Sequence, residues 1–286
     1  AITTNGTLLT REVVDYFTGN GIILQVSIDG ERATHDCNRP FAASGDRSSF
    51  DVIMDHLRHL QPRPRDLAVS MVFRPDNIQS LIKNISFLNG QLFSMIDFFP
   101  DFYAQWSLDG FKTAEKVFED FADYYVGLFN GGGRIFKNLT IDAKFINEID
   151  INTIDHCRKI HLNPDGAFYV CDKVFSLDPE ERKKYIIGDV KSGIDEDRRA
   201  EILISLRRDF FNDSGAGCCG CGSRRYCFCP AGHYIYAASL SARHEDERAQ
   251  NVYKAFCFFS GLYIRTFLKI KSVLRYHPDF IRLYQY

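Results

Sequence analysis

Four short apolar runs, separated by stretches with helical periodicity, fill the first hundred residues. Their near-continuous apolar character is typical of buried parallel strands. The runs are Ala1–Thr4, Ile22–Ser27, Leu67–Phe73 and Phe93–Phe99. Helices are indicated between them by a capping Thr10, by the capping-box pattern of Ser48 and Asp51, and by an apolar stripe over Ile78–Leu88. Strand, helix and strand in alternation predict an α/β fold with a parallel sheet, either open or curled into a barrel.

Two polar turns follow the first two predicted strands. These are "TNG" (Thr4–Gly6) and "SIDG" (Ser27–Gly30). In parallel α/β folds the reactive face lies beyond the carboxyl ends of the strands, where such turns meet. The sequence therefore predicts a ligand site at these turns, although Asn-Gly and Asp-Gly are also common in turns without any ligand.

The character of the chain changes after about residue 109. An aromatic-rich amphipathic helix, "TAEKVFEDFADYYVGLF", is closed by the glycines of Asn130–Gly133. Beyond it we expect short strands at Gly166–Val170 and Tyr185–Val190, a helix over Asp195–Phe211, and a helical, aromatic C-terminal tail. We accordingly predict two domains, residues 1–150 and residues 151–286.

Composition limits the partners and the compartment of this protein. Its 35 basic and 37 acidic residues nearly cancel and form no run of like charge, so nothing indicates a nucleic-acid partner. No stretch approaches the roughly 20 apolar residues that cross a bilayer, and no secretory signal is evident, so we expect a cytoplasmic protein without a membrane partner.

Five of the nine cysteines lie within twelve positions, in "CCGCGSRRYCFC". In a reducing cytoplasm such clusters are better explained by metal or iron–sulfur ligands than by disulfides. Two thiolates that are two residues apart, such as Cys218 and Cys221, can clamp a metal or a cluster from one side. Four thiolates bind zinc as readily as a [4Fe–4S] cluster, so the spacing alone does not choose between them.

Several of these segments together resemble a known superfamily. The runs "TTNGTLLT", "VSIDGERATHDCNRP" and "SSFDVIMDHLRHL" look like the third and fourth βα units of radical SAM enzymes. The layout "GAFYVCD", "IGDV" and C-x2-C-x5-C is similar to their C-terminal SPASM extension, which holds two auxiliary [4Fe–4S] clusters. Members include anaerobic sulfatase-maturating enzymes and ribosomal-peptide maturases. The resemblance implies a partial (β/α)6 TIM-like barrel with its later strands present, a small cysteine-rich SPASM domain and a C-terminal helix.

The resemblance also assigns metal ligands. Three cysteines correspond to the first auxiliary cluster: Cys157, Cys171 and Cys229. Four correspond to the second: Cys218, Cys221, Cys227 and Cys257. The chain departs from the family in two ways, because only Phe228 separates Cys227 from Cys229 and because the first cluster lacks a fourth cysteine. Cys37 and Cys219 have no counterpart in the family pattern.

Further residues are assigned to S-adenosylmethionine (AdoMet) and to the chemistry. Ser27 resembles the hydroxyl that helps to hold AdoMet, and Arg39 resembles the arginine that accompanies this motif, a suitable bidentate partner for a carboxylate. Thr4 and Asn5 are expected to line the same site. Asp172 matches the acidic residue that serves as the proposed catalytic base in sulfatase maturases. Its alternative role is structural, in a turn or in a pair near Lys173.

Two family motifs are not found in the sequence. No three cysteines have the Cys-x3-Cys-x2-Cys spacing that holds the radical SAM cluster, and the Gly-Gly-Glu-Pro motif is missing as well. Both would precede Ala1, so we expect that an N-terminal part holding a third [4Fe–4S] cluster is missing. The chain alone should then be inactive, because it supplies no ligands for the cofactor that forms the radical.

The resemblance implies an oxidoreductase that modifies a residue of a peptide or protein after translation, by oxidation or by a thioether or carbon–carbon crosslink. A reductant such as flavodoxin or ferredoxin would be its redox partner. One alternative is a non-catalytic zinc- or cluster-binding module on a degenerate barrel. Another is an enzyme of the same class that acts on a small molecule.

Overall fold

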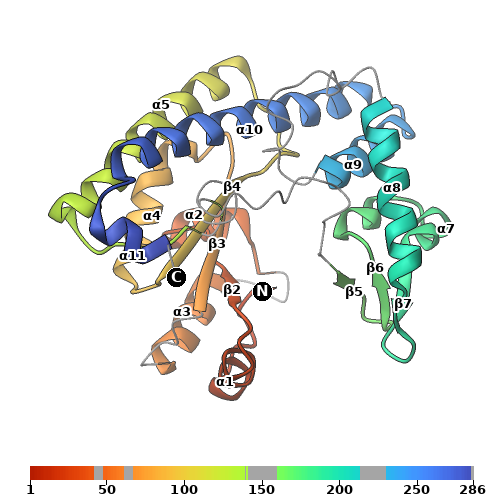
Figure 1. Cartoon of the computed structure of the whole chain (residues 1–286), viewed down its shortest axis with the longest axis horizontal. Helices are drawn as coiled ribbons and strands as arrows, with labels where there is room; N and C mark the ends of the chain where they lie inside the picture. The colour runs from red at the N-terminus through yellow and green to blue at the C-terminus, as the bar shows by residue number, and fades with distance from the viewer. Residues whose placement is uncertain (42–47, 61–66, 139, 141–159, 213–229, 285–286) are drawn as a thin grey trace. The chain divides into compact units, whose positions relative to one another are not determined.

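A computed structural model describes residues 1–41, 48–60, 67–138, 140, 160–212 and 230–284 (Figure 1). The chain forms two compact units. The first consists of Ala1–Asp101, Ser107–Asn147 and Arg265–Tyr286, and the second of Phe102–Trp106 and Glu148–Ile264. The domain boundary expected near residue 150 lies outside the described residues.

The first unit contains a parallel four-stranded sheet, as the sequence predicts. Its strands are β1 (Ile2–Thr4), β2 (Leu24–Ser27), β3 (Leu67–Phe73) and β4 (Met95–Pro100), and they lie side by side in chain order (Figure 1). β3 has the predicted limits, whereas β2 and β4 each begin two residues later than expected. Beyond β4, the backbone of Lys137 forms a parallel bridge with Met95, which extends the sheet edge.

Helices follow each strand along the chain, as expected of right-handed α/β units. They are α1 (Arg11–Gly19), α2 (Arg32–Asn38), α3 (Ser49–His59), η1 (Ile78–Ser80), α4 (Leu81–Gly90) and α5 (Leu108–Gly127). Thr10 and Ser48 cap α1 and α3, because their hydroxyls accept hydrogen bonds from the Val13 and Asp51 amides. The long helix α5 begins five residues before the predicted "TAEKV", because Ser107 caps it by accepting from the Gly110 amide.

The two faces of the sheet differ in chemistry. One face is apolar and buried along β2, β3 and β4, with Phe98 packed edge-on against Phe118 and Phe121 of α5. On the other face the Thr3 hydroxyl donates to Gln25 Oε1 at 3.3 Å. Thr3 is exposed and Gln25 is partly exposed, which corrects the expectation that these strands are buried on both faces. Hydrogen bonds among the polar side chains stabilise this face in place of apolar cover.

The C-terminal tail is helical, as predicted. It forms α10 (Asp246–Leu274) and α11 (Pro278–Tyr284), and the end of α10 belongs to the first unit. Within that unit, Arg265 and Lys269 of α10 form ion pairs with Glu115 and Asp123 of α5. These pairs are exposed, so each contributes at most about 1 kcal/mol.

Tyr284 joins α11 to the unit through buried hydrogen bonds. Its hydroxyl lies 2.6 Å from Tyr125 Oη and accepts from the Asn138 amide at 3.0 Å. Burial, together with the neighbouring Tyr284, raises the pKa of Tyr125 well above its usual value, so this hydroxyl stays protonated. We expect Tyr284→Phe to lower the free energy of unfolding by about 1–3 kcal/mol, because it leaves a buried amide without an acceptor. Urea unfolding would measure this, and Tyr276→Phe, at a 79% exposed position, should change almost nothing. Equal effects of the two variants would contradict the prediction.

The second unit is built on a small antiparallel sheet. Its strands are β5 (His161–Leu162), β6 (Ala167–Tyr169), β7 (Ile186–Asp189) and β8 (Gly193–Ile194), in chain order. The helices of this unit include η5 (Asp172–Ser176), α7 (Pro179–Arg182), η6 (Lys183–Tyr185), α8 (Glu196–Asn212) and α9 (Pro230–Ser241). The strand pieces at 166–170 and 185–190 and the helix over 195–211 were predicted, whereas α9 was not. No helix among the described residues has the length and apolar character needed to cross a bilayer.

Candidate functional site at the carboxyl ends of the strands

The "SIDG" turn after β2 holds a buried carboxylate at the edge of the sheet. Asp29 is 1% exposed, and Arg39 binds it with two parallel hydrogen bonds, Nε to Oδ2 at 2.9 Å and Nη2 to Oδ1 at 3.0 Å. The Val72 amide of β3 also donates to Asp29 Oδ1, at 2.8 Å. Arg39 therefore lies at the carboxyl end of the sheet, next to the turn that the sequence singled out.

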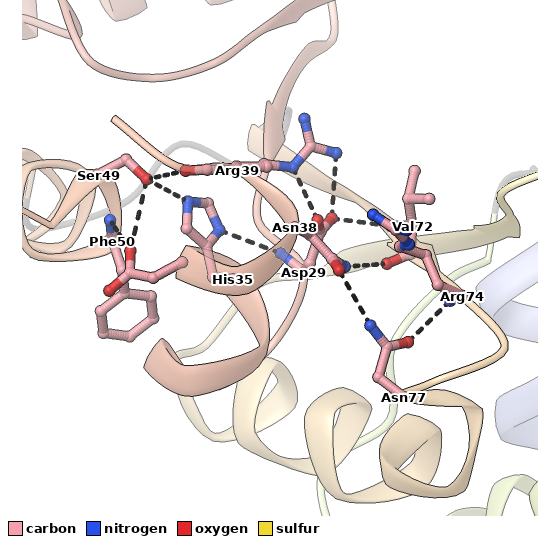
Figure 2. Close-up of polar contacts among 10 residues, drawn as sticks. Asp29, His35, Asn38, Arg39, Ser49, Phe50, Val72, Arg74 and Asn77 are labelled. Carbon is pink, nitrogen blue, oxygen red and sulfur yellow. Dashed lines mark hydrogen bonds and ion pairs between the residues drawn. The ribbon is translucent and has the colours of Figure 1, made fainter. Parts of the chain in front are cut away.

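Arg39 keeps part of its binding capacity in this arrangement. A guanidinium has five N–H donors, and the pair with Asp29 uses two of them. Nη1 points away from Asp29 (Figure 2), and the Arg39 side chain is 32% exposed. The remaining donors suit a carboxylate or phosphate ligand. Arg39 thus has a structural partner in Asp29, which the sequence did not identify, and donors left for a ligand.

His35 lies behind this ion pair and is fully buried. Its Nδ1 accepts from the Asp29 amide at 3.3 Å, and its Nε2 lies 3.1 Å from the hydroxyl of Ser49 (Figure 2). Burial lowers the pKa of His35; Asp29 and Asp36 raise it in part, and Arg39 lowers it further. His35 is therefore held as the neutral imidazole at neutral pH.

The carboxylate of Asp36 fixes the start of α3 against α2. It accepts from the Ser48 hydroxyl at 2.7 Å and from the Phe50 amide at 3.2 Å. Partial burial raises the pKa of Asp36, but these two hydrogen bonds outweigh it, with help from His35 and Arg32, so that the pKa is lowered. Asp36 therefore stays ionised. Because it binds Ser48 and Phe50, it keeps Ser49, which lies between them in the sequence, beside His35.

Asparagines complete the edge of the site. Asn38 donates to the Val72 carbonyl at 3.2 Å, and Asn77 donates to Asn38 at 3.0 Å (Figure 2). The side-chain oxygen of Asn77, Oδ1, in turn accepts from the Arg74 backbone amide at 2.8 Å. These bonds connect the end of α2 to β3 and to the loop after it. The pair with Asp29 connects Arg39, the next residue, to the turn after β2.

The "TNG" turn after β1 satisfies much of its own hydrogen bonding. Thr4 Oγ1 accepts from the Gly6 amide at 3.2 Å, and Asn5 Oδ1 accepts from both the amide and the hydroxyl of Thr7. His56 of α3 contacts the Gly6 carbonyl at 3.2 Å. The predicted ligand residues Thr4 and Asn5 therefore stabilise this turn; a role in ligand binding stays a prediction for both.

Ser27 belongs to a polar face that the sequence interpretation missed. It is 8% exposed and lies opposite Ser70 of β3, which in turn lies opposite Asp97 of β4. In a parallel sheet such neighbours project from the same face. Asp97 is 3% exposed; it accepts from the Gln25 side chain at 3.3 Å and from the Thr140 amide at 3.2 Å. The available signal was the alternation of polar Gln25 and Ser27 in "LQVS", together with the single polar residues at the ends of "AVS" and "MID".

In the second unit, Cys171 and Asp172 are adjacent at the start of η5. Cys171 is buried; its Sγ accepts from the Lys173 amide at 3.4 Å and donates to Asp172 Oδ1 at 3.6 Å. Asp172 is about half exposed and pairs with Lys173 Nζ at 2.8 Å. Cys257 is exposed on α10. Five predicted ligands, Cys157, Cys218, Cys221, Cys227 and Cys229, lie outside the described residues.

No protein-family model and no curated protein matches the chain. Solved structures do match its fold. Native anSMEcpe with bound AdoMet has a TM-score of 0.60 at 15% identity, covering 95% of this chain and 75% of that one. The complex of native anSMEcpe with AdoMet and the Cp18Cys peptide has a TM-score of 0.60 at 14% identity, with the same coverage. Histidine-tagged anSMEcpe with AdoMet has a TM-score of 0.57 at 15% identity, covering 99% of this chain and 75% of that one. The chain therefore shares the fold of these structures over most of its length.

Proposed function

We propose that this chain is part of a radical SAM enzyme with SPASM-type auxiliary clusters, which modifies a residue of a peptide or protein. anSMEcpe is an anaerobic sulfatase-maturating enzyme of the radical SAM class with a SPASM domain, and it has been solved with AdoMet and with peptides. The shared fold supports the class of chemistry. We further propose that the modification is an oxidation or a crosslink.

The observation that carries the proposal is the position of Arg39. Its guanidinium is fixed by Asp29 at the carboxyl end of a parallel sheet, the edge where ligands bind in α/β folds. The donors left on Arg39 fit the carboxylate of the methionyl group of AdoMet. Ser27, the last residue of β2, would add a hydroxyl. These two residues bind and orient the ligand in our proposal.

The donor chemistry at Cys171 fits an iron–sulfur ligand. Thiolates are the form that binds clusters, and a backbone N–H directed at the sulfur can stay hydrogen-bonded to that form. Cys171 Sγ accepts such a bond from the Lys173 amide. In our proposal Cys171, Cys157 and Cys229 hold one auxiliary cluster, and Cys218, Cys221, Cys227 and Cys257 hold the other. A bound cluster would accept an electron from the substrate.

Asp172 is the proposed base. Its carboxylate pairs with Lys173 Nζ at 2.8 Å, and a carboxylate is a group that can take up a proton. Its half-exposed side chain is accessible for that purpose. A proton lost from a substrate thiol or hydroxyl would go to an Asp172 carboxylate oxygen, next to the Cys171 ligand.

Cysteine replacement tests the cluster assignment. We expect Cys171→Ser, purified without oxygen, to lose about half of its iron and sulfide, because Cys171 is assigned to one of two auxiliary clusters. Cys37→Ser is the matched control; Cys37 is an exposed cysteine without a counterpart in the family pattern and should retain the full content. Iron, acid-labile sulfide and zinc would be measured on the same samples.

The outcomes separate the proposed function from its alternative. Iron and sulfide in wild-type protein, reduced in Cys171→Ser alone, would support the auxiliary clusters. Zinc without sulfide would instead favour a structural metal module and overturn the radical chemistry. An equal loss in both variants would contradict the role assigned to Cys171.

A further inference from the structure

His35 completes a ring of hydrogen bonds that holds Arg39 by its guanidinium and by its backbone carbonyl. The Arg39 guanidinium binds the Asp29 carboxylate, and the Asp29 amide donates to His35 Nδ1. On the other side of the imidazole, Nε2 meets Ser49 Oγ, and that hydroxyl donates to the Arg39 carbonyl at 2.7 Å. Figure 2 shows the ring, which runs from Arg39 through Asp29, His35 and Ser49 back to Arg39.

The ring permits one tautomer of His35. The Asp29 amide can only donate, so Nδ1 must be the unprotonated acceptor. Because the Ser49 proton is directed at the Arg39 carbonyl, Ser49 Oγ is left to accept, and Nε2 must carry the imidazole proton. The Ser49 contact with Asp36 Oδ1, at 3.5 Å, is too long to compete.

Protonation of the imidazole is incompatible with the ring. A proton on Nδ1 would face the Asp29 N–H at the present separation of 3.3 Å, so two donors would meet and neither would have an acceptor. The charged ring would also lie in a fully buried site. The groups facing His35 are Asp29 from the turn after β2, Asp36 from α2, Arg39 directly after α2, and Ser49 and Phe50 from α3.

We propose that His35, as the neutral Nε2–H tautomer, is a positioning residue that keeps Arg39 directed toward a carboxylate ligand at the edge of the sheet. It acts through the Asp29 backbone and through Ser49 and touches no ligand itself. Protonation opens the ring and releases Arg39, so ligand binding weakens in acid. The identification of the ligand as AdoMet rests on the proposed function, whereas the positioning of Arg39 does not.

The full chain labelled with 15N histidine and arginine tests this directly. Near neutral pH, two-bond nitrogen–proton spectra should show His35 with a bare Nδ1 and a protonated Nε2. As pH falls below about 6.5, the usual value for histidine, the slowly exchanging Arg39 Nε–H signal should disappear with the same midpoint as His35 protonation. The proposal would be overturned by a protonated Nδ1 at neutral pH. It would also be overturned by an Arg39 Nε–H signal that does not change as His35 becomes protonated.

Two variants divide the ring. In His35→Asn the side-chain oxygen can still accept from the Asp29 amide, whereas in His35→Gln the side-chain nitrogen can still reach Ser49; neither titrates. Both should abolish the Arg39 transition at the histidine midpoint. If the same transition persists in both, His35 is not its origin, and the role of His35 is wrong. A purely structural role would not couple Arg39 to the histidine midpoint.

AdoMet binding by equilibrium dialysis separates this inference from the proposed function. Affinity should fall by at most about tenfold per pH unit below the midpoint, because one proton is coupled to binding. If Arg39 follows His35 but AdoMet does not bind at any pH, the positioning role stands and the identification of the ligand fails. If AdoMet binds without this pH dependence, the positioning role is overturned.

Discussion

Replacing Asp29 by alanine is expected to lower the free energy of unfolding by about 3 kcal/mol. Removing one member of a buried ion pair typically costs about 3–5 kcal/mol, and the lower end applies because Arg39 is partly exposed and can regain water. The loss also includes the Val72 amide, which keeps no carboxylate to donate to. Urea unfolding, with the midpoint and slope compared to wild type, would measure the change.

The chain contains a matched control for Asp29. Arg11 and Asp15 of α1 form a pair at similar distances, with Arg11 Nε at 2.9 and 2.8 Å from the two carboxylate oxygens, but a single nitrogen makes both contacts and both side chains are about half exposed. Asp15→Ala should therefore cost at most about 0.5 kcal/mol. Similar losses for the two variants would show that burial of the Asp29 pair contributes little.

Asp29→Ala should also weaken AdoMet binding in our proposal, because it leaves the Arg39 side chain without the partner that fixes it. Asp29→Asn separates the two effects. Its amide oxygen can still accept from the Val72 amide, which retains part of the stability, but the neutral side chain no longer forms the ion pair with Arg39. Weak AdoMet binding with largely retained stability is the expected result for Asp29→Asn.

Local rules were enough to predict much of the first unit. The apolar run of β3 ends where "RPDN" begins, and the hydroxyls of Thr10 and Ser48 mark helix starts. Each of these signals depends only on neighbouring residues. α9 was missed because its sequence, "PAGHYIYAASLS", has little amphipathic character and follows a cysteine-rich segment.

The candidate site was predictable in its location but not in its contacts. The turns after β1 and β2 identify an edge of the sheet, because parallel strands end together. The ion pair between Asp29 and Arg39, however, depends on the geometry of α2. The polar face of Ser27, Ser70 and Asp97 depends on the register between strands that are far apart in the sequence. The cluster ligands rest on resemblance, and most of them lie outside the described residues.

Gly30→Ala is expected to cost about 4 kcal/mol of folding free energy, because backbone strain and a steric clash add. Gly30 has φ of +110°, a conformation that L-residues rarely adopt, and a Cβ there would lie 2.2 Å from Asn84 Cγ. Moving the Asn84 side chain away would break its hydrogen bonds. It is 3% exposed, its Oδ1 accepts from the Glu31 amide at 3.0 Å, and its amide group donates to Thr34 at 3.3 Å.

Two further variants separate strain from clash. Gly21→Ala introduces the same side chain at φ of +68°, where nothing lies within 4 Å of the new Cβ, so it should cost only about 1–2 kcal/mol of backbone strain. Adding Asn84→Ala to Gly30→Ala removes the clashing atoms beyond Cβ but also the hydrogen bonds of Asn84. The double variant should therefore lose less than the sum of the two single losses. An additive result would mean that the two residues do not contact each other, and it would contradict the close packing of the turn that positions Asp29 for Arg39.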